Sequence, residues 1–231
     1  MYADSFTQSG HVTLPAMVDA AELQAIAAML AQTMARPREM LSLPWCAALA
    51  DKLRGQLVAA GLLPAGFVSV QCTAFEKSRD QNWLVAPHQD LSIPVARRVD
   101  DPALSGWSDK DGTLFVQPPV AVLAQLVALR LHIDACQAHD GALKVVPGSH
   151  LAGRIQEADK AHLKATRGEV VCPVAPGGGM AMRPLLLHAS SKATGDSRRR
   201  VLHFVFGPAV LPFGMEWASP EPDSSAPRSV R

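Results

Sequence analysis

Two histidines and one carboxylate in this chain have the residue types and spacing of a metal site. His88 and Asp90 are separated by a single residue, and His188 follows much later in the chain. Because residues i and i+2 of a strand point to the same side, His88 and Asp90 can reach one ion while Gln89 points away. Two imidazoles and one carboxylate can occupy one face of an octahedral Fe(II) and leave three positions open. The spacing therefore indicates an iron site with room for additional ligands.

A second His-x-Asp motif, at His132 and Asp134, competes with the first. His88 and Asp90 stand where an apolar run ends, a rim position from which ligands can face a cavity. His132 and Asp134 lie within a predicted strand and share a face with Arg130. Unpaired buried charge is costly, so such a row is typical of a polar pocket wall or a paired network. We therefore expect the metal at His88 and Asp90, and pocket-lining roles for the other three residues.

Arg199 indicates that the same site also binds an acid. It lies on a predicted strand, where it alternates to the same side as His203. A hairpin would place it beside His188, with Ser190 close by. A guanidinium can hold a carboxylate through two parallel charge-assisted hydrogen bonds. A metal site beside a carboxylate clamp points to a metal-dependent reaction with an acidic co-substrate.

Short β-type runs must position these residues. They are expected at residues 67–75, 127–134, 143–146, 169–174, 180–188 and 201–206. Their regular turn signals favour a sandwich or jelly roll. Before them, Asp19 and Glu22 form a capping box at the start of one helix, and a second helix is expected from Ser42 to Gly61. We predict a helical part at 1–64 that buttresses a β core at 65–208.

Two segments lie outside this pattern. Long loops in compact domains are often functional, so residues 96–124 are expected either to form a lid that brings Trp107 and Lys110 to the substrate, or to be a solvated excursion with Trp107 packed on the barrel. Residues 216–231 are rich in Pro and Ser, which predicts a flexible tail after a single domain at 1–215.

The composition argues against several classes of partner. Lys and Arg number 22 and Asp and Glu 21, so there is no basic field for nucleic acid or an anionic membrane. Neither a membrane helix of roughly 20 apolar residues nor a secretory signal is visible. The cysteines are scattered singly, as is typical of thiols in a reducing compartment. They are Cys46, Cys72, Cys136 and Cys172. We expect a cytoplasmic protein that acts on a small molecule.

Three stretches of the sequence carry a family resemblance. They are HQDLSIPV at 88–95, DGALKVVPGSH at 140–150 and RPLLLHASSKATGDSRRRVLHF at 183–204. Together, and in this order, they resemble the phytanoyl-CoA dioxygenase-like family of Fe(II)/2-oxoglutarate-dependent oxygenases. The resemblance implies a mainly β fold with flanking N-terminal helices, the double-stranded β-helix, which is a cupin-like jelly roll. It also implies that the iron ligands are His88, Asp90 and His188.

The resemblance further implies where 2-oxoglutarate binds. Arg199 and Ser190 would hold its distal carboxylate, and Arg130 falls where related enzymes often place a side chain that lines the cofactor pocket. Gln71 and Thr73, on the first predicted strand, would also be within reach of 2-oxoglutarate.

The activity implied is hydroxylation of an unactivated C–H bond, with consumption of O2 and conversion of 2-oxoglutarate to succinate and CO2. Asp90 favours hydroxylation, because related halogenases replace this carboxylate by a small residue. The long segment 96–124 and the lack of a basic patch for CoA phosphates make a small polar metabolite or an amino-acid derivative at least as good a substrate class as an acyl-CoA.

Two other classes of function stay open. One is a catalytically silent β-helix domain that binds a ligand or partner. The other is a zinc- or other metal-dependent hydrolase or isomerase, because zinc also accepts three protein ligands plus water. The intact set of metal residues argues against the first, and the Arg199–Ser190 pair argues against the second, since a hydrolase needs no carboxylate clamp there.

Overall fold

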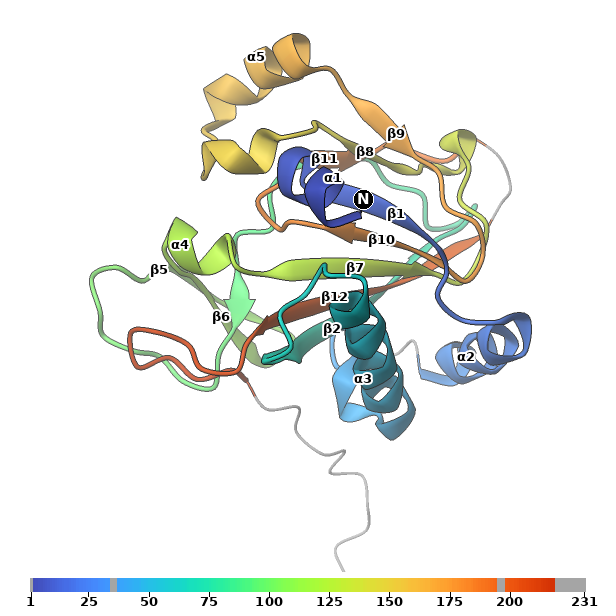
Figure 1. Cartoon of the computed structure of the whole chain (residues 1–231), viewed down its shortest axis with the longest axis horizontal. Coiled ribbons are helices and arrows are strands. Elements are labelled where there is room, and N and C mark those ends of the chain that lie inside the picture. Colours follow the sequence, from blue (N-terminus) through green and yellow to red (C-terminus); the bar gives the residue numbers. More distant parts are fainter. Residues whose placement is uncertain (1, 34–36, 195–197, 219–231) are drawn as a thin grey trace, which may run out of the picture.

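Three antiparallel sheets organise the computed structural model, which describes residues 2–33, 37–194 and 198–218 (Figure 1). The first has the strand order β1-β10-β7-β12-β2, the second β3-β11-β8-β9 and the third β4-β6-β5. The strands are β1 (His11–Ala16), β2 (Phe67–Lys77), β3 (Val85–His88), β4 (Ile93–Pro94), β5 (Ser105–Lys110), β6 (Thr113–Gln117), β7 (Val127–His132), β8 (Leu143–Val145), β9 (Val170–Cys172), β10 (Gly178–Met182), β11 (His188–Ser190) and β12 (Arg199–Pro208). The α-helices are α1 (Tyr2–Ser9), α2 (Ala20–Thr33), α3 (Pro44–Ala59), α4 (Val120–Leu123) and α5 (Glu157–Arg167).

The five-stranded sheet buries both of its faces. Leu129 and Leu202 point to one face, where they pack against Leu53 of α3 and the rest of a large apolar cluster. Ala128 and Met180 point to the other face, in a second cluster that includes residues of the four-stranded sheet. Alternation along each strand therefore separates a helix-covered outer face from an inner face that lies within the jelly roll.

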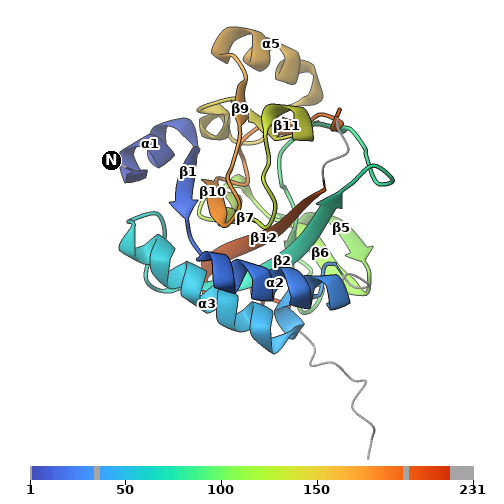
Figure 2. The same ribbon diagram turned by 90° about the vertical axis from the view of Figure 1, so that its right-hand side faces the viewer.

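The layers follow from these contacts (Figures 1 and 2). Helices α2 and α3 cover the outer side of the five-stranded sheet, the four-stranded sheet faces its inner side, and α5 lies beyond the four-stranded sheet. Two facing antiparallel sheets with flanking N-terminal helices confirm the expected fold class, a mainly β jelly roll of the double-stranded β-helix type.

The N-terminal part agrees only partly with the prediction. Asp19 caps α2, since its Oδ1 accepts the backbone N–H of Glu22 at 2.8 Å, and α3 ends just before Gly61, whose φ is 71°. However, residues 1–64 are not uniformly helical. Strand β1 lies among them and pairs with β10, with Val12 opposite Ala181. The N-terminal segment thus supplies an edge strand to the main sheet.

Segment 96–124 is an ordered part of the fold. It holds the hairpin of β5 and β6, which joins β4 in the third sheet, and helix α4. Trp107 packs against the apolar cluster inside the barrel, with the Arg98 guanidinium 5.2 Å from the centre of its ring. Packing of Trp107 on the barrel agrees with the second of the two expectations, although the segment is a small sheet and not a solvated loop.

The C-terminal prediction needs a correction at its start. The expected tail begins at residue 216, but Trp217 bridges to Val95 and the carbonyl of Glu216 accepts the backbone N–H of Ala96 at 2.9 Å. These contacts hold residues 216–218 against the barrel. Residues 219–231 lie outside the described part of the chain.

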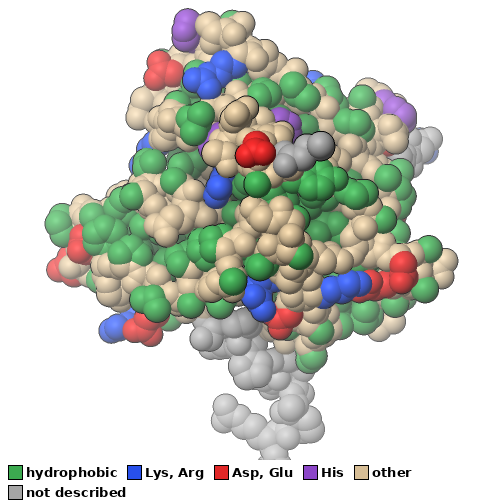
Figure 3. All heavy atoms as spheres, in the orientation of Figure 1, with side chains coloured by type: hydrophobic (Ala, Val, Ile, Leu, Met, Phe, Trp, Pro, Cys, Tyr) green, Lys and Arg blue, Asp and Glu red, His purple; other side chains and the backbone are tan. Residues whose placement is uncertain are grey.

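The surface shows no concentration of one charge on the face drawn in Figure 3, where basic and acidic side chains occur singly or in small mixed groups. This agrees with the formal net charge of +1. Among the described residues, no helix is long and apolar enough to cross a membrane. All four cysteines are buried and free, as the sequence predicted.

Candidate active site

The three predicted metal ligands lie together where two neighbouring strands, β3 and β11, have their adjoining ends. His88 ends β3 and His188 begins β11, and the two residues are direct partners in the antiparallel pairing of these strands. His88 Nε2 is 3.8 Å from Asp90 Oδ1, and His188 Nε2 is 3.9 Å from Asp90 Oδ2. One donor atom from each residue lies within 4.8 Å of the other two. This geometry suits a metal site in which three protein ligands occupy one face of the ion and the other positions stay open.

Both histidines are oriented by backbone carbonyls. His88 Nδ1 is 2.9 Å from the oxygen of Ala86, and His188 Nδ1 is 2.8 Å from the oxygen of Leu186. A carbonyl oxygen can only accept, so each Nδ1 must carry the proton and each Nε2 keeps a free lone pair. Both free lone pairs belong to the atoms nearest Asp90, which is the arrangement that a divalent metal requires.

The electrostatics of the three groups also suit a metal. Burial lowers the pKa of His188 to about 4, so that its ring is neutral at physiological pH. Burial acts to raise the pKa of Asp90, but His188, His203 and His88 act against it and hold that pKa below its usual value. A neutral imidazole pair and an ionised carboxylate are the protonation states in which these side chains bind metal.

Gln89 points away from the metal ligands, as predicted. It is buried, and its side-chain amide donates to the carbonyl oxygens of Gly153 at 2.8 Å and Leu185 at 2.5 Å. Its Oε1 accepts the backbone N–H of Ile155 at 2.8 Å. The residue between the two ligands is therefore an anchor that fixes the backbone of the His-x-Asp motif.

Arg199 and Ser190 meet at the carbonyl oxygen of Gly141, together with a lysine that the sequence analysis missed. Arg199 begins β12, is buried, and donates through Nη1 to the carbonyl oxygen of Gly141. Lys77 is its direct partner on β2, and Lys77 Nζ donates to Ser190 Oγ at 2.5 Å. Burial, followed by Arg199 and Arg130, lowers the pKa of Lys77 to about 8. Three donors thus converge where an acid could bind.

A periodic signal for Lys77 exists in the sequence. Gln71, Thr73 and Lys77 share one face of β2 at period two. The predicted strand stopped at Phe75, whereas the observed strand continues to Lys77 and so carries the lysine to the acid-binding end.

Residues 6–201 match the family model for phytanoyl-CoA dioxygenase (PhyH). This chain belongs to the PhyH family. A comparison with curated proteins finds no match.

Solved structures of similar fold add to this. The epimerase SnoN from nogalamycin biosynthesis, described as non-heme and alpha-ketoglutarate-dependent, is 16% identical, with a TM-score of 0.68 over 92% of this chain and 85% of that one. AviO1 from Streptomyces viridochromogenes Tue57 is 18% identical, with a TM-score of 0.66 over 91% and 96%. HygX from Streptomyces hygroscopicus, solved with nickel and 2-oxoglutarate bound, is 18% identical, with a TM-score of 0.62 over 89% and 85%. At these identities, the likeness shows a shared fold.

In this PhyH protein, the inner face of the five-stranded sheet carries further polar residues beside the metal ligands. Arg130 and His203 are opposite each other on β7 and β12, and Thr73 is opposite His203 on β2. Arg130 Nη1 is 3.4 Å from His203 Nδ1, and His203 Nε2 is 3.9 Å from Asp90 Oδ2. Burial, followed by Arg130, lowers the pKa of His203 to about 3, so the neutral ring can accept from the guanidinium. Alternation along the strand predicts that His203 lies on the same face as Arg199, but the sequence did not indicate its contacts with Arg130 and Asp90.

Gln71 and Thr73 lie on the same strand as Lys77. Both point to the inner face of β2, and Gln71 Nε2 donates to Thr73 Oγ1 at 3.1 Å. Lys110, on the β5–β6 hairpin, holds its Nζ 4.4 Å from the centre of the Phe115 ring. Burial and then Arg38 lower the pKa of Lys110, while Asp90 acts to raise it, so Lys110 is within electrostatic reach of the metal ligands.

The two residues of the competing His-x-Asp motif, His132 and Asp134, lie in different environments. His132 ends β7, is buried on the inner face, and has a pKa lowered to about 3 by burial and then by Arg130. Asp134 lies beyond the end of the strand, so the alternation that would bring it inside does not reach it. Its carboxylate accepts from the backbone N and the guanidinium of Arg200 at 2.8–2.9 Å. The expected pocket-lining role of Asp134 is therefore wrong, and its partner is Arg200.

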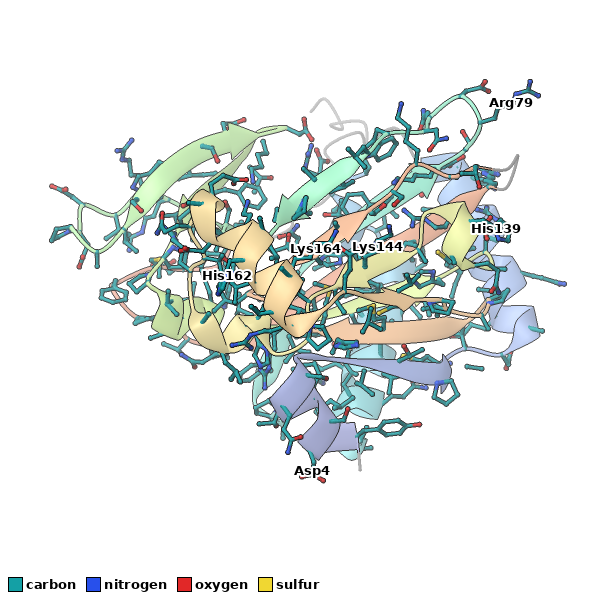
Figure 4. The ribbon with its side chains drawn as sticks, turned by 90° about the horizontal axis from the view of Figure 1, so that it is seen from above. Asp4, Arg79, His139, Lys144, His162 and Lys164 are labelled. Carbon is teal, nitrogen blue, oxygen red and sulfur yellow. The ribbon has the colours of Figure 1, made fainter. Side chains whose placement is uncertain are left out.

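A cavity of about 270 Å³ lies between β11 and α5, and His188 is among the residues that line it. Figure 4 shows Lys144 and Lys164 close together where α5 crosses β8. Glu169 contacts both, with its Oε2 2.8 Å from Lys164 Nζ and its Oε1 3.8 Å from Lys144 Nζ. His162, labelled nearby on α5, is exposed. The cations of this cavity are paired, in contrast to those inside the barrel.

Proposed function

We propose that this protein is an Fe(II)- and 2-oxoglutarate-dependent dioxygenase that hydroxylates an unactivated C–H bond of a small molecule. The observation that carries the proposal is the presence of two groups of side chains at different levels of the barrel interior. At one level, His88, Asp90 and His188 present metal-binding atoms within 4.8 Å of one another. At the other level, Arg199 and Lys77 face each other across β12 and β2.

The residues of the chain divide the work between these two levels. The two imidazoles and Asp90 would hold Fe(II) and leave one face of it open. Arg199, Lys77 and Ser190 would hold the distal carboxylate of 2-oxoglutarate through charge-assisted hydrogen bonds. Gln71 and Thr73 would line the wall at the level of the metal ligands, where Thr73 is opposite His203 and accepts from Gln71. Burial of the clamp excludes water, which strengthens each of these contacts.

When bound, Fe(II), 2-oxoglutarate and O2 together supply the oxidising chemistry, in which 2-oxoglutarate becomes succinate and CO2 and one oxygen atom enters the substrate as a hydroxyl group. The chain contributes orientation and a shielded pocket. Asp90 supports hydroxylation as the outcome, because its carboxylate occupies the position that related halogenases leave open. The free, buried cysteines support a cytoplasmic location.

Similar folds perform more than one reaction, which makes product identification part of the test. SnoN is described as an epimerase and SnoK, another nogalamycin enzyme of similar fold, as a carbocyclase. Under the proposal, a substrate found in a screen yields a hydroxylated product together with one succinate. A product of unchanged composition would replace hydroxylation by epimerisation and leave the metal and 2-oxoglutarate assignments intact.

The binding test uses purified apo-protein, titrated anaerobically with Fe(II) and then 2-oxoglutarate while visible absorption is recorded. We expect a charge-transfer band in the wild type and in His132→Ala, and none in His88→Ala. His132 is the matched control, because it is a buried histidine on the inner face that does not belong to the three-ligand group. A band that survives in folded His88→Ala but is lost in His132→Ala would show that the metal binds at His132 and that the proposed metal site is wrong.

A further inference from the structure

The inner face of the five-stranded sheet carries more positive charge than the carboxylates of the proposed site would balance. Arg199, Lys77 and Arg130 lie within electrostatic reach of one another, and Asp90 is the carboxylate that acts on Arg130. In the loaded site, the two charges of Fe(II) are balanced by Asp90 and by the proximal carboxylate of 2-oxoglutarate. Arg199 and Lys77 share the one distal carboxylate, which leaves one positive charge over at that end. Arg130 is a second positive charge, without a carboxylate of its own.

Arg130 itself is poorly satisfied. Its side chain belongs to a residue that is 8% exposed, and its Nε has no hydrogen-bond partner within the described part of the chain. Within the described residues, the side-chain hydrogen bond that it makes is the 3.4 Å contact of Nη1 with His203 Nδ1, at the long end of the range for such bonds. A buried guanidinium without a counter-ion is costly, so the arrangement calls for an anion that the chain does not provide.

The position of Arg130 separates it from the 2-oxoglutarate clamp. Along β12, Arg199 is opposite Lys77, whereas Arg130 and Thr73 are both opposite His203, further along the strand and beside Asp90. Arg130 therefore lies at the level of the metal ligands. The distal carboxylate of 2-oxoglutarate would lie at the level of Ser190, which binds Lys77.

The same level of the barrel opens to solvent. The side chains of His88 and Asp90 are 40% and 36% exposed. Phe75 is 37% exposed, and the Arg130 guanidinium lies 5.7 Å from the centre of its ring. A molecule that enters here meets one apolar aromatic wall, the open face of the metal, and one guanidinium.

We propose that the substrate is a small carboxylic acid with an apolar body, and that Arg130 binds its carboxylate beside the metal; this inference rests on the proposed function. A planar guanidinium fork matches a carboxylate with two parallel hydrogen bonds. One guanidinium also balances the single charge of a carboxylate, whereas a phosphate monoester carries about −1.5 to −2 at neutral pH and needs more donors. The exposed ring of Phe75 accommodates the apolar remainder of the acid.

The experiment measures binding by calorimetry to protein loaded with Mn(II) and saturating 2-oxoglutarate, conditions that give no turnover. The probes are benzoate with benzamide and hexanoate with hexanamide, acids matched to their neutral amides, and phenyl phosphate. We expect at least one acid to bind about tenfold or more tightly than its amide, the value of one charge-assisted hydrogen-bonded contact. The preference should disappear in Arg130→Gln, persist in part in Arg130→Lys, and remain intact in Arg97→Gln, a change at an exposed arginine paired with Glu216.

The same protein separates the alternatives. Titration of 2-oxoglutarate should show about a hundredfold loss of affinity in Arg199→Gln, and less than about a threefold change in Arg130→Gln. An equal loss in folded Arg130→Gln would make Arg130 part of the clamp and overturn the inference. So would an acid preference that survives Arg130→Gln, equal binding of acid and amide in every pair, or tighter binding of phenyl phosphate than of either acid. A wild type that binds no 2-oxoglutarate would instead overturn the proposed function.

Discussion

At the scale of the residue, the least obvious member of the site is Lys77. Its amine is buried, donates to Ser190 Oγ and Ser191 O, and has a pKa of about 8. A lysine with this pKa is close to the point where its charge depends on pH, while the neighbouring Arg199 stays charged. The clamp therefore combines one permanent cation with one that can be lost.

This gives a pH-dependent prediction. Carboxylate binding favours the charged amine and raises its pKa, so above pH 8 the free protein must take up a proton in order to bind 2-oxoglutarate. The affinity for 2-oxoglutarate is measured by calorimetry on the Mn(II) protein. The contribution of Lys77 to this affinity should be constant below pH 8 and should fall as the pH rises above 8. In Lys77→Met, affinity should be about tenfold or more lower at pH 7 and lose this fall.

Lys144→Met is the matched control, because Lys144 lies on the face of the four-stranded sheet under α5 and pairs with Glu169. It should retain both the affinity and its dependence on pH. If Lys77→Met keeps the wild-type fall above pH 8, the titrating group lies elsewhere.

At the scale of the element, the end of β7 decides which polar residues enter the barrel. The strand ends at His132, and Asp134 turns outward to bind Arg200, whose guanidinium also lies 3.4 Å from the carbonyl oxygen of Ala27 on α2. A single carboxylate thus ties the end of β7 to β12 and, through Arg200, to the covering helix.

We expect Asp134→Ala to lower the free energy of unfolding by about 2 kcal/mol, because it leaves a largely buried guanidinium unpaired. Urea denaturation measures this change, and Mn(II) and 2-oxoglutarate affinities should stay unchanged. Asp51→Ala is the control: its 3.7 Å contact with Arg54 is solvent-exposed, so its removal should cost less than about 0.5 kcal/mol. Loss of metal binding in folded Asp134→Ala would return this residue to the pocket.

At the scale of the whole molecule, the two histidines of the candidate metal site come from one sheet, and most of the residues proposed to bind acids come from the other. His88 and His188 belong to the four-stranded sheet, whereas Arg199, Lys77 and Arg130 belong to the five-stranded sheet. A ligand that bridges these two groups of residues therefore holds the two sheets together, so binding should stabilise the fold.

The expected size follows from mass action. At one hundred times the dissociation constant, a ligand specific for the folded state adds about 2.7 kcal/mol, which corresponds to a rise of about 5–10 °C in Tm for a chain of this length. Differential scanning calorimetry with Mn(II) and 2-oxoglutarate, before and after addition of a chelator, should show this rise and its reversal. His188→Ala should show no rise, and His132→Ala should show the full one.

Several features of this protein were determined by the sequence by itself. The jelly roll and the buttressing helices could be predicted from local spacing, periodicity and recognisable motifs. So could the proximity of His88, Asp90 and His188 and that of Arg199 and Ser190. Their signals are short-range: i and i+2 alternation places His88 with Asp90, and the same alternation places Arg199 with His203.

Only the tertiary structure decided the rest. The pairing of β1 with β10, the cooperation of Lys77 with Arg199, the stacking of Arg130 over Phe75 and the outward turn of Asp134 all depend on where strands end and which residues they meet. Register between strands is set by long-range packing of the whole barrel, and one residue more or less of strand moves a side chain to the opposite face. For this reason the residues of the candidate site could be predicted from the sequence, whereas the grouping of Arg199, Lys77 and Arg130 inside the barrel required the tertiary structure.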